Sequence, residues 1–142
     1  MSYTFPQIKQ KIGELGLPSG QYILVGGSAL AAHGLRETKD LDIAVVPELF
    51  ERLVSEGWEL DLAYHGKWNR RRVVKDGVEI YPDFYLEKQD RFLDVQTMID
   101  EADIIEGIPL VSLSQLLLFK EDSGREKDLA DIALIADFLN SR

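Results

Sequence analysis

The sequence contains no cysteine among its 142 residues. This absence excludes a disulfide framework, a cysteine-ligated zinc or iron–sulfur site and a thiol nucleophile. Hydrophobic runs are also short, since no stretch approaches the ~18 apolar residues that a membrane span requires, and the first residues show no apolar signal segment. We therefore expect a soluble, cytoplasmic protein with no membrane partner.

Basic residues are few, with 16 Lys and Arg against 25 Asp and Glu, and the formal net charge is −9. This balance disfavours non-specific coating of DNA, because affinity for the phosphate backbone comes from cationic side chains. It still allows a local basic site within an acidic molecule. A chain of this length is typical of one domain with a core of its own, so we expect a single domain over residues 1–142.

Apolar spacing of three to four residues predicts helices, and alternation or a compact apolar run predicts strands. The expected helices are 5–15, 29–33, 47–54, 91–99, 113–121 and 126–139. The expected strands are 22–25, 40–46, 58–64, 68–74 and 78–81. Ser112 is predicted to cap one helix and Gly124 to end it. The apolar face of the last helix is predicted to be Leu129, Ile132, Ala133 and Ala136. The chain is therefore a mixed α/β protein.

A run of small residues, Gly26-Gly27-Ser28, follows the predicted strand 22–25 and precedes a helix-forming segment. Glycines let the backbone come close to a ligand, free N–H groups at a helix start point outward, and the serine hydroxyl adds a donor. This arrangement predicts a phosphate-binding loop that lacks a lysine. An ordinary tight turn is the alternative interpretation of so short a motif.

Asp40 and Asp42 stand two residues apart on the next predicted strand. Their carboxylates therefore share one face, while Leu41 and Ile43 point into the core. Neighbouring carboxylates raise each other's pKa unless a cation neutralises them. Mg²⁺ prefers such oxygen ligands together with phosphate oxygens, so the pair predicts a magnesium site beside the glycine loop. An acidic edge strand in contact with solvent is the alternative.

These motifs resemble the signature of the minimal nucleotidyltransferases of the DNA polymerase beta-like superfamily. The resemblance is carried by Gly26-Gly27-Ser28, Gly34, Arg36, Thr38, Asp40 and Asp42. Segments 107–120 and 125–131 are similar to the C-terminal helices of that family, especially of small members that include the toxins of abortive-infection toxin–antitoxin systems. The resemblance spans residues 21–137. It implies an α/β (α+β) nucleotidyltransferase fold, with a central mixed β-sheet flanked by helices.

The resemblance also implies an activity and the residues that perform it. A nucleoside monophosphate would pass from a nucleoside triphosphate, such as ATP, to an acceptor. Asp40, Asp42 and a third carboxylate would be catalytic and would hold two Mg²⁺ ions, with Mn²⁺ as a substitute. The expected nucleotide-binding residues are Gly26, Gly27, Ser28, Thr38, Lys120 and Lys127. For the two lysines, solvated positions near helix ends are the alternative interpretation.

The third carboxylate is either Glu79 or Asp83. If Val78 and Ile80 face the core, both acids lie on the opposite face, but they stand ~13 Å apart along an extended strand and could not join one site. Glu79 is preferred as the catalytic and metal-binding residue, because its place between two hydrophobic residues matches the family position. Asp83 would need a bend at Pro82.

The one cluster of basic residues in the sequence lies at 67–75 and includes Trp68. It predicts a strip for an RNA acceptor or for the triphosphate, because phosphates attract arginine and bases stack on tryptophan. A charged edge strand is the alternative. The acceptor stays open between tRNA, a protein and a small molecule, and an antitoxin protein is a further partner that the resemblance implies. The alternative function is a catalytically inactive protein of the same fold that binds a nucleotide or a partner.

Overall fold

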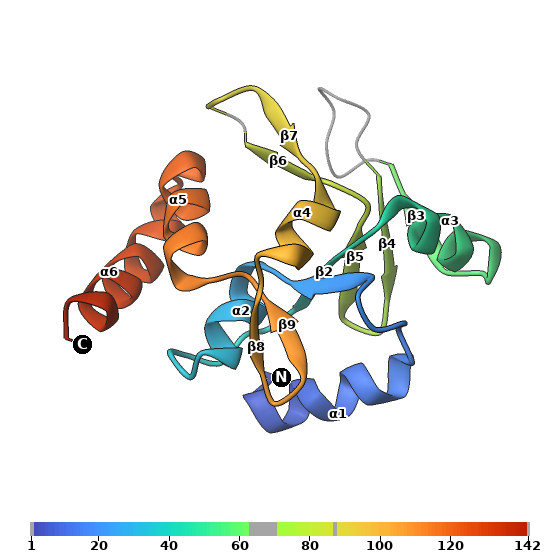
Figure 1. Ribbon diagram of the computed structural model, residues 1–142, viewed down its shortest axis with the longest axis horizontal. Helices are drawn as coiled ribbons and strands as arrows, with labels where there is room; N and C mark the ends of the chain where they lie inside the picture. Colours follow the sequence, from blue (N-terminus) through green and yellow to red (C-terminus); the bar gives the residue numbers. More distant parts are fainter. Residues whose placement is uncertain (1, 63–70, 87, 142) are drawn as a thin grey trace.

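A computed structural model describes residues 2–62, 71–86 and 88–141 (Figure 1). The helices are α1 (Phe5–Leu15), α2 (Gly26–Ala32), α3 (Pro47–Ser55), α4 (Val95–Asp100), α5 (Leu113–Ser123) and α6 (Glu126–Asn140). The strands are β1 (Tyr22–Leu24), β2 (Leu41–Val45), β3 (Glu59–Asp61), β4 (Arg72–Lys75), β5 (Val78–Tyr81), β6 (Phe84–Leu86), β7 (Arg91–Leu93), β8 (Asp103–Ile105) and β9 (Ile108–Leu110). None of these described helices has the length and apolar character needed to cross a membrane.

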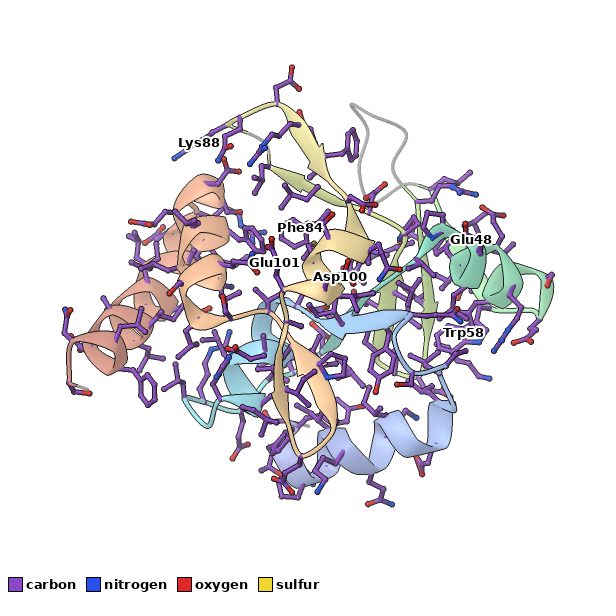
Figure 2. The ribbon with its side chains drawn as sticks, viewed as in Figure 1. Glu48, Trp58, Phe84, Lys88, Asp100 and Glu101 are labelled. Atoms are coloured by element: carbon purple, nitrogen blue, oxygen red, sulfur yellow. The ribbon has the colours of Figure 1, made fainter. Side chains whose placement is uncertain are left out.

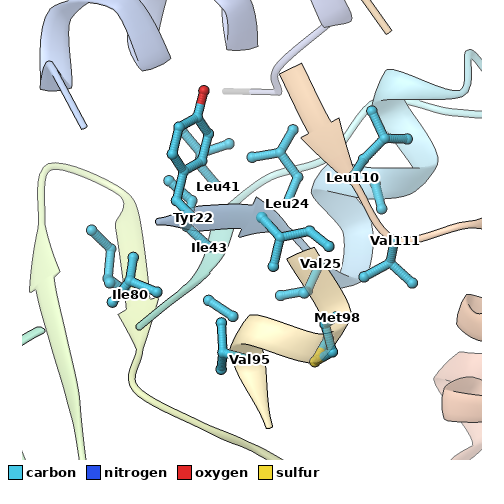
Figure 3. Close-up of a cluster of buried hydrophobic side chains, with 14 of the residues drawn as sticks. Tyr22, Leu24, Val25, Leu41, Ile43, Ile80, Val95, Met98, Leu110 and Val111 are labelled. Atoms are coloured by element: carbon cyan, nitrogen blue, oxygen red, sulfur yellow. The ribbon is translucent and has the colours of Figure 1, made fainter. Parts of the chain in front are cut away.

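Seven of the described strands form one mixed sheet in the order β3-β4-β5-β2-β1-β9-β8, and β6 pairs with β7 in a separate hairpin. At the centre, β2 runs antiparallel to β1 and parallel to β5. Helices α1 and α4 lie on opposite sides of the sheet (Figures 1 and 3). The predicted architecture, a central mixed β-sheet flanked by helices, is confirmed.

The core is built from strand residues that alternate between the two faces of the sheet. Ile43 on β2 is paired with Ile80 on β5, and both side chains are fully buried. Because side chains alternate along a strand, the neighbouring pair Asp42 and Glu79 lies on the opposite face. Helix α4 covers part of that face, and Figure 3 shows its Val95 beside the core strands. The sheet therefore presents two carboxylates next to a packed core.

Several helix ends follow directly from local sequence. The Ser112 hydroxyl accepts a hydrogen bond from the Gln115 N–H at 3.2 Å, so it caps α5 as predicted. Gly124 ends α5 in the left-handed conformation, with φ 59°, which glycine adopts without strain. Pro47 stands in the first turn of α3, where its missing N–H has no partner to lose. The predicted bounds of α1, α3, α5 and α6 are confirmed to within two residues.

Other local predictions were wrong. Residues 91–93 form strand β7 rather than the start of a helix, because they pair with β6, and α4 begins only after Asp94 caps it through the Thr97 N–H. Helix α2 begins at Gly26, not at residue 29. Strands β6, β8 and β9 were not predicted. Strand β3 lies within the expected strand 58–64, and β4 overlaps the expected strand 68–74 but extends to Lys75. Residues 63–70 lie outside the described part of the chain.

The buried face of α6 also differs from the predicted one. Two of the four predicted residues, Ile132 and Ala136, are half-buried, but Leu129 is 59% exposed and Ala133 is exposed. Asp128 and Asp131 are buried instead, at 1% and 6% exposure. Apolar spacing alone could not predict this, because ion pairs with Arg36, Lys120 and Arg125 hold the two carboxylates inward.

Candidate functional site

The parallel pairing of β2 with β5 places Asp42 directly beside Glu79. Asp42 and Glu79 are both half-buried, and Asp40, just before β2, is exposed. All three line a pocket with a volume of about 560 Å³. The three residues predicted to be catalytic therefore meet in one cavity, which lies in the volume range of small-molecule sites.

The electrostatics of Asp42 are unusual for an aspartate. Burial, followed by the close carboxylate of Glu79 and the charge of Asp40, raises the pKa of Asp42 to about 8, although the charge of Lys120 opposes the shift. Negative charge on this face of the sheet is therefore costly to the folded protein until a cation or a proton offsets it.

Glu79 has partners that the sequence did not indicate. Arg72 on β4 donates to Glu79 Oε1 at 2.6 Å and to Asp61 Oδ2 at 3.0 Å, and the Tyr81 hydroxyl donates to Glu79 Oε2 at 3.2 Å. Burial and the negative charges of Asp42 and Glu79 raise the pKa of Tyr81, which keeps its hydroxyl protonated. Tyr81 stands two residues after Glu79 on β5, so strand alternation alone places both side chains on one face. Arg72 lies on the neighbouring strand β4, and its contact with Glu79 could not be assigned before the pairing of β4 with β5 was known.

Asp83 lines the same pocket as Glu79. The expectation that these two acids could not share a site assumed one extended strand. Strand β5 ends at Tyr81, and Pro82 lies in a bend before β6 begins at Phe84. Both candidates for the third carboxylate therefore reach the cavity, with Glu79 beside Asp42 in the sheet.

The glycine loop approaches the carboxylates closely. Gly26 lines the pocket with φ 55°, and a Cβ placed there would lie 3.0 Å from Asp42 Oδ2. Gly27 is buried, and a Cβ there would lie 2.5 Å from Thr38 Oγ1. The loop is thus glycine-rich because neighbouring side chains occupy the space that larger residues would need.

The hydroxyls of Ser28 and Thr38 are engaged within the protein. Ser28 is fully buried and its Oγ accepts a 2.6 Å hydrogen bond from the Asp42 N–H. Thr38 is 5% exposed and its Oγ1 donates to the Asp40 carbonyl oxygen at 2.9 Å. In this conformation the two hydroxyls hold the backbone that carries Asp40 and Asp42, and neither lines the pocket.

Lys120 reaches the pocket from α5 within a network of charges. Its Nζ lies 3.3 Å from Asp128 Oδ1 and 3.1 Å from Asp131 Oδ2, and its side chain is 13% exposed. Arg36 donates two hydrogen bonds to the Asp131 carboxylate, at 2.7 and 2.9 Å, and Arg125 donates one to Asp128 at 3.0 Å. This network, named here the α6 ion network, comprises Arg36, Lys120, Arg125, Asp128 and Asp131. It joins the loop before β2 to the last two helices.

The remaining predicted cations are placed in different surroundings. Lys127 is exposed and lines the pocket. Arg71 pairs with Glu51 at 2.6 Å and lies over the Phe50 ring, and Lys75 lies over the Trp58 ring. Residues 67–70 of the predicted basic strip lie outside the described part of the chain.

The donor set suits a hard divalent cation in its chemistry. Within residues 2–62, 71–86 and 88–141, no group of three or more His, Asp or Glu side chains is arranged to hold a metal ion by protein ligands alone. Mg²⁺, however, commonly takes only one or two carboxylates and completes its shell with water and substrate phosphates. Asp42, with its raised pKa and its neighbours Asp40 and Glu79, fits that mode of binding.

Comparison with known proteins identifies the fold. No family model and no curated protein matches the chain. Among solved structures, the crystal structure of a Thermotoga maritima protein, described provisionally as a nucleotidyltransferase, matches 99% of this chain and 97% of its own. The TM-score is 0.58 and the sequence identity is 20%. The chain is therefore similar to that protein in fold, and its mixed sheet with flanking helices is a nucleotidyltransferase fold.

Proposed function

We propose that this chain is a Mg²⁺-dependent nucleotidyltransferase, which moves a nucleoside monophosphate from a nucleoside triphosphate to a hydroxyl or phosphate acceptor. The observation that carries the proposal is the meeting of Asp40, Asp42 and Glu79 in one pocket, with Lys120 on its wall. In such a cavity the carboxylates can bind the metal ions and the lysine can bind the phosphate oxygens, so together they suit a metal-bound triphosphate.

The proposal assigns metal binding to the carboxylates and phosphate binding to the glycine backbone and the lysines. Asp40 and Asp42, with Glu79, would hold two Mg²⁺ or Mn²⁺ ions, which supply positive charge to the phosphate oxygens. Gly26, which lines the pocket, would let the backbone approach the phosphates, and Gly27 would leave room for Thr38 behind it. Ser28 and Thr38 hold the backbone that presents the aspartates. Lys120 and Lys127 would attract the outer phosphates. The acceptor, RNA included, and an antitoxin partner are predictions of the resemblance.

A second candidate is a catalytically inactive protein of this fold that binds a nucleotide or a partner. It is favoured by the 2.6 Å pair between Arg72 and Glu79, because that arginine already neutralises the carboxylate which an active enzyme would offer to a metal ion. Transfer of a labelled nucleotide separates the two candidates, since only the first predicts a product.

The test incubates the full chain with labelled nucleoside triphosphates and Mg²⁺, and measures transfer of the label to the protein itself or to added RNA. We expect Asp42→Asn to lower transfer by about 100-fold or more, because the metal loses its central ligand. At neutral pH and without metal, the same variant should raise the free energy of unfolding by about 1 kcal/mol, because folding no longer has to protonate a carboxyl group whose pKa it raises to about 8. Asp137→Asn, an exposed position on α6 away from the pocket, is the matched control. Absence of both transfer and Mg²⁺-dependent triphosphate binding in the unaltered chain would contradict the proposal.

A further inference from the structure

A second part of the pocket wall is apolar and comes from two elements distant in sequence. Phe84 and Leu86 on β6 and Leu116 and Phe119 on α5 line the cavity. The Phe84 and Phe119 rings lie 4.4 Å apart and are tilted by 35°. Figure 2 shows Phe84 in the space between the β6–β7 hairpin and α5. We refer to these four residues as the aromatic wall.

The hairpin that carries the aromatic wall is held to α5 at its tip. The Lys88 Nζ donates to the Glu121 carbonyl oxygen at 3.3 Å, and the Lys88 N–H donates to Asp122 Oδ2 at 3.4 Å. Figure 2 shows Lys88 at the end of the hairpin on the side of α5. The two elements that carry the aromatic wall are thus joined to each other, and Phe84 is half-buried beside the cavity.

A carboxylate stands beside this wall. Asp122 follows Phe119 by three residues on α5, a spacing that puts both on one face of a helix, and Asp122 lines the pocket half-buried. An ionised carboxylate can only accept hydrogen bonds. It therefore favours a ligand edge that carries N–H groups and disfavours one dominated by carbonyl oxygens.

We propose that the aromatic wall is the nucleobase subsite of the triphosphate pocket, and that Asp122 selects bases with an amino group over uracil. This inference rests on the proposed function, because Lys120, next to Phe119 on α5, then receives the phosphates. Every base offers a flat face to an aromatic side chain. Adenine, cytosine and guanine offer amino hydrogens to a carboxylate, while the N3–H of uracil stands between two carbonyl oxygens that a carboxylate repels.

The hairpin supplies a matched control for the wall. Phe92 on β7 packs on Tyr85, with ring centroids 4.8 Å apart, and is 47% exposed. Tyr85 also lines the pocket, but Phe92 does not, so a substitution of Phe92 leaves the lining residues themselves unchanged. Glu121, the exposed neighbour of Asp122, is the corresponding control for loss of a carboxylate.

The experiment measures binding of ATP, GTP, CTP, UTP and inorganic tripolyphosphate to the full chain with Mg²⁺ by calorimetry. The unaltered chain should bind UTP about tenfold more weakly than the other three nucleotides. Phe84→Leu should weaken all four nucleotides by about tenfold and leave tripolyphosphate unchanged, because only the base loses a stacking partner. Asp122→Asn should bring UTP to within about threefold of the others, because an amide also donates hydrogen bonds. Phe92→Leu and Glu121→Gln should alter none of these affinities.

The outcomes separate this inference from the function on which it rests. The base subsite would be overturned if the unaltered chain bound tripolyphosphate and all four nucleotides with equal affinity. It would also be overturned if Phe84→Leu weakened the binding of tripolyphosphate as much as the binding of the nucleotides. Either result would leave a triphosphate site in place. Unchanged discrimination against UTP in Asp122→Asn would overturn the selective role of that carboxylate. Failure of the unaltered chain to bind any of the five compounds would overturn the proposed function and the subsite together. The Asp122 variant keeps the test decisive if Phe84→Leu does not fold.

Discussion

Gly27 is the residue at which the site leaves least room for a side chain. A Cβ at this position would lie 2.5 Å from Thr38 Oγ1, and Thr38 is itself fixed by its hydrogen bond to the Asp40 carbonyl oxygen. We predict that Gly27→Ala lowers the free energy of unfolding by about 2 kcal/mol, because overpacking must displace Thr38 or the loop. Urea titration followed by circular dichroism measures the change.

Gly13 provides the comparison for this substitution. It lies inside α1, and no described atom outside its own surroundings comes within 4 Å of a Cβ there. Gly13→Ala should therefore raise stability by about 0.5 kcal/mol through the lower entropy of the unfolded chain. Equal effects of the two substitutions would show that the crowding at Gly27 is relieved without cost.

Residue patterns predicted the acids of the site better than their partners. Alternation along a strand was enough to place Asp42 on the face opposite Ile43, and the structure has that arrangement. The contact of Arg72 with Glu79 depends on how two strands are paired, which no local pattern specifies. Nor could a motif show that the Ser28 hydroxyl serves the Asp42 N–H.

Helix α6 shows how charge can decide which face of an element is buried. Burial alone would raise the pKa of Asp131, but hydrogen bonds from Arg36 and Lys120 outweigh it and hold that pKa below its ordinary value. Burial likewise opposes the shift at Asp128, where Arg125 and Lys120 lower the pKa. Both carboxylates are therefore charged in the folded protein at neutral pH. Their ion pairs keep Asp128 and Asp131 buried, while Leu129, which periodicity places on the buried face, is exposed.

This arrangement predicts the effect of Asp131→Asn. The variant should lose about 2 kcal/mol of unfolding free energy at pH 7, because Arg36 and Lys120 lose their shared carboxylate. A carboxyl group whose pKa is depressed by folding stabilises the protein above its unfolded pKa of about 4, and the stabilisation disappears as pH falls through the folded pKa. The difference between variant and unaltered chain should therefore shrink below about pH 4. Thermal unfolding between pH 3 and 7 measures it, and a difference that stays constant with pH would contradict the assignment.

Strand β7 shows that pairing with another strand can override a helical pattern in the local sequence. Arg91, Phe92 and Leu93 precede a helix and share its apolar spacing, but they pair with β6 as a strand. The choice depends on a partner strand and on the Asp94 cap that delays the helix start. Short apolar runs can form either element, so the contact with β6 and not the run itself decides the outcome.

For the whole molecule, the excess of negative charge predicts a dependence on ionic strength. A net charge of −9 implies self-repulsion in the compact state. Raising NaCl from about 10 to about 200 mM should screen it and raise the melting temperature by about 3 °C, the shift that ~1 kcal/mol produces in a chain of this size. Differential scanning calorimetry measures the shift. Tetramethylammonium chloride should act equally; a response confined to NaCl would indicate a bound sodium ion instead.

The order of the strands was the part of the fold least accessible to sequence patterns. The α/β class and most helix positions follow from local spacing, and the mixed sheet follows from the family resemblance. The parallel pairing of β1 with β9 joins Leu24 to Leu110, two segments whose own patterns contain no information about each other. Two of the unpredicted strands, β8 and β9, form this side of the sheet.

The ion pair between Arg36 and Asp131 links positions 95 residues apart in the chain. During synthesis, which proceeds from the N-terminus at a limited rate, the loop that presents Asp40 and Asp42 leaves the ribosome long before the aspartate that anchors it. Until Asp131 has been synthesised, the nascent chain therefore carries its acidic cluster without the pair between Arg36 and Asp131. The pocket can be completed only after the last helix has emerged.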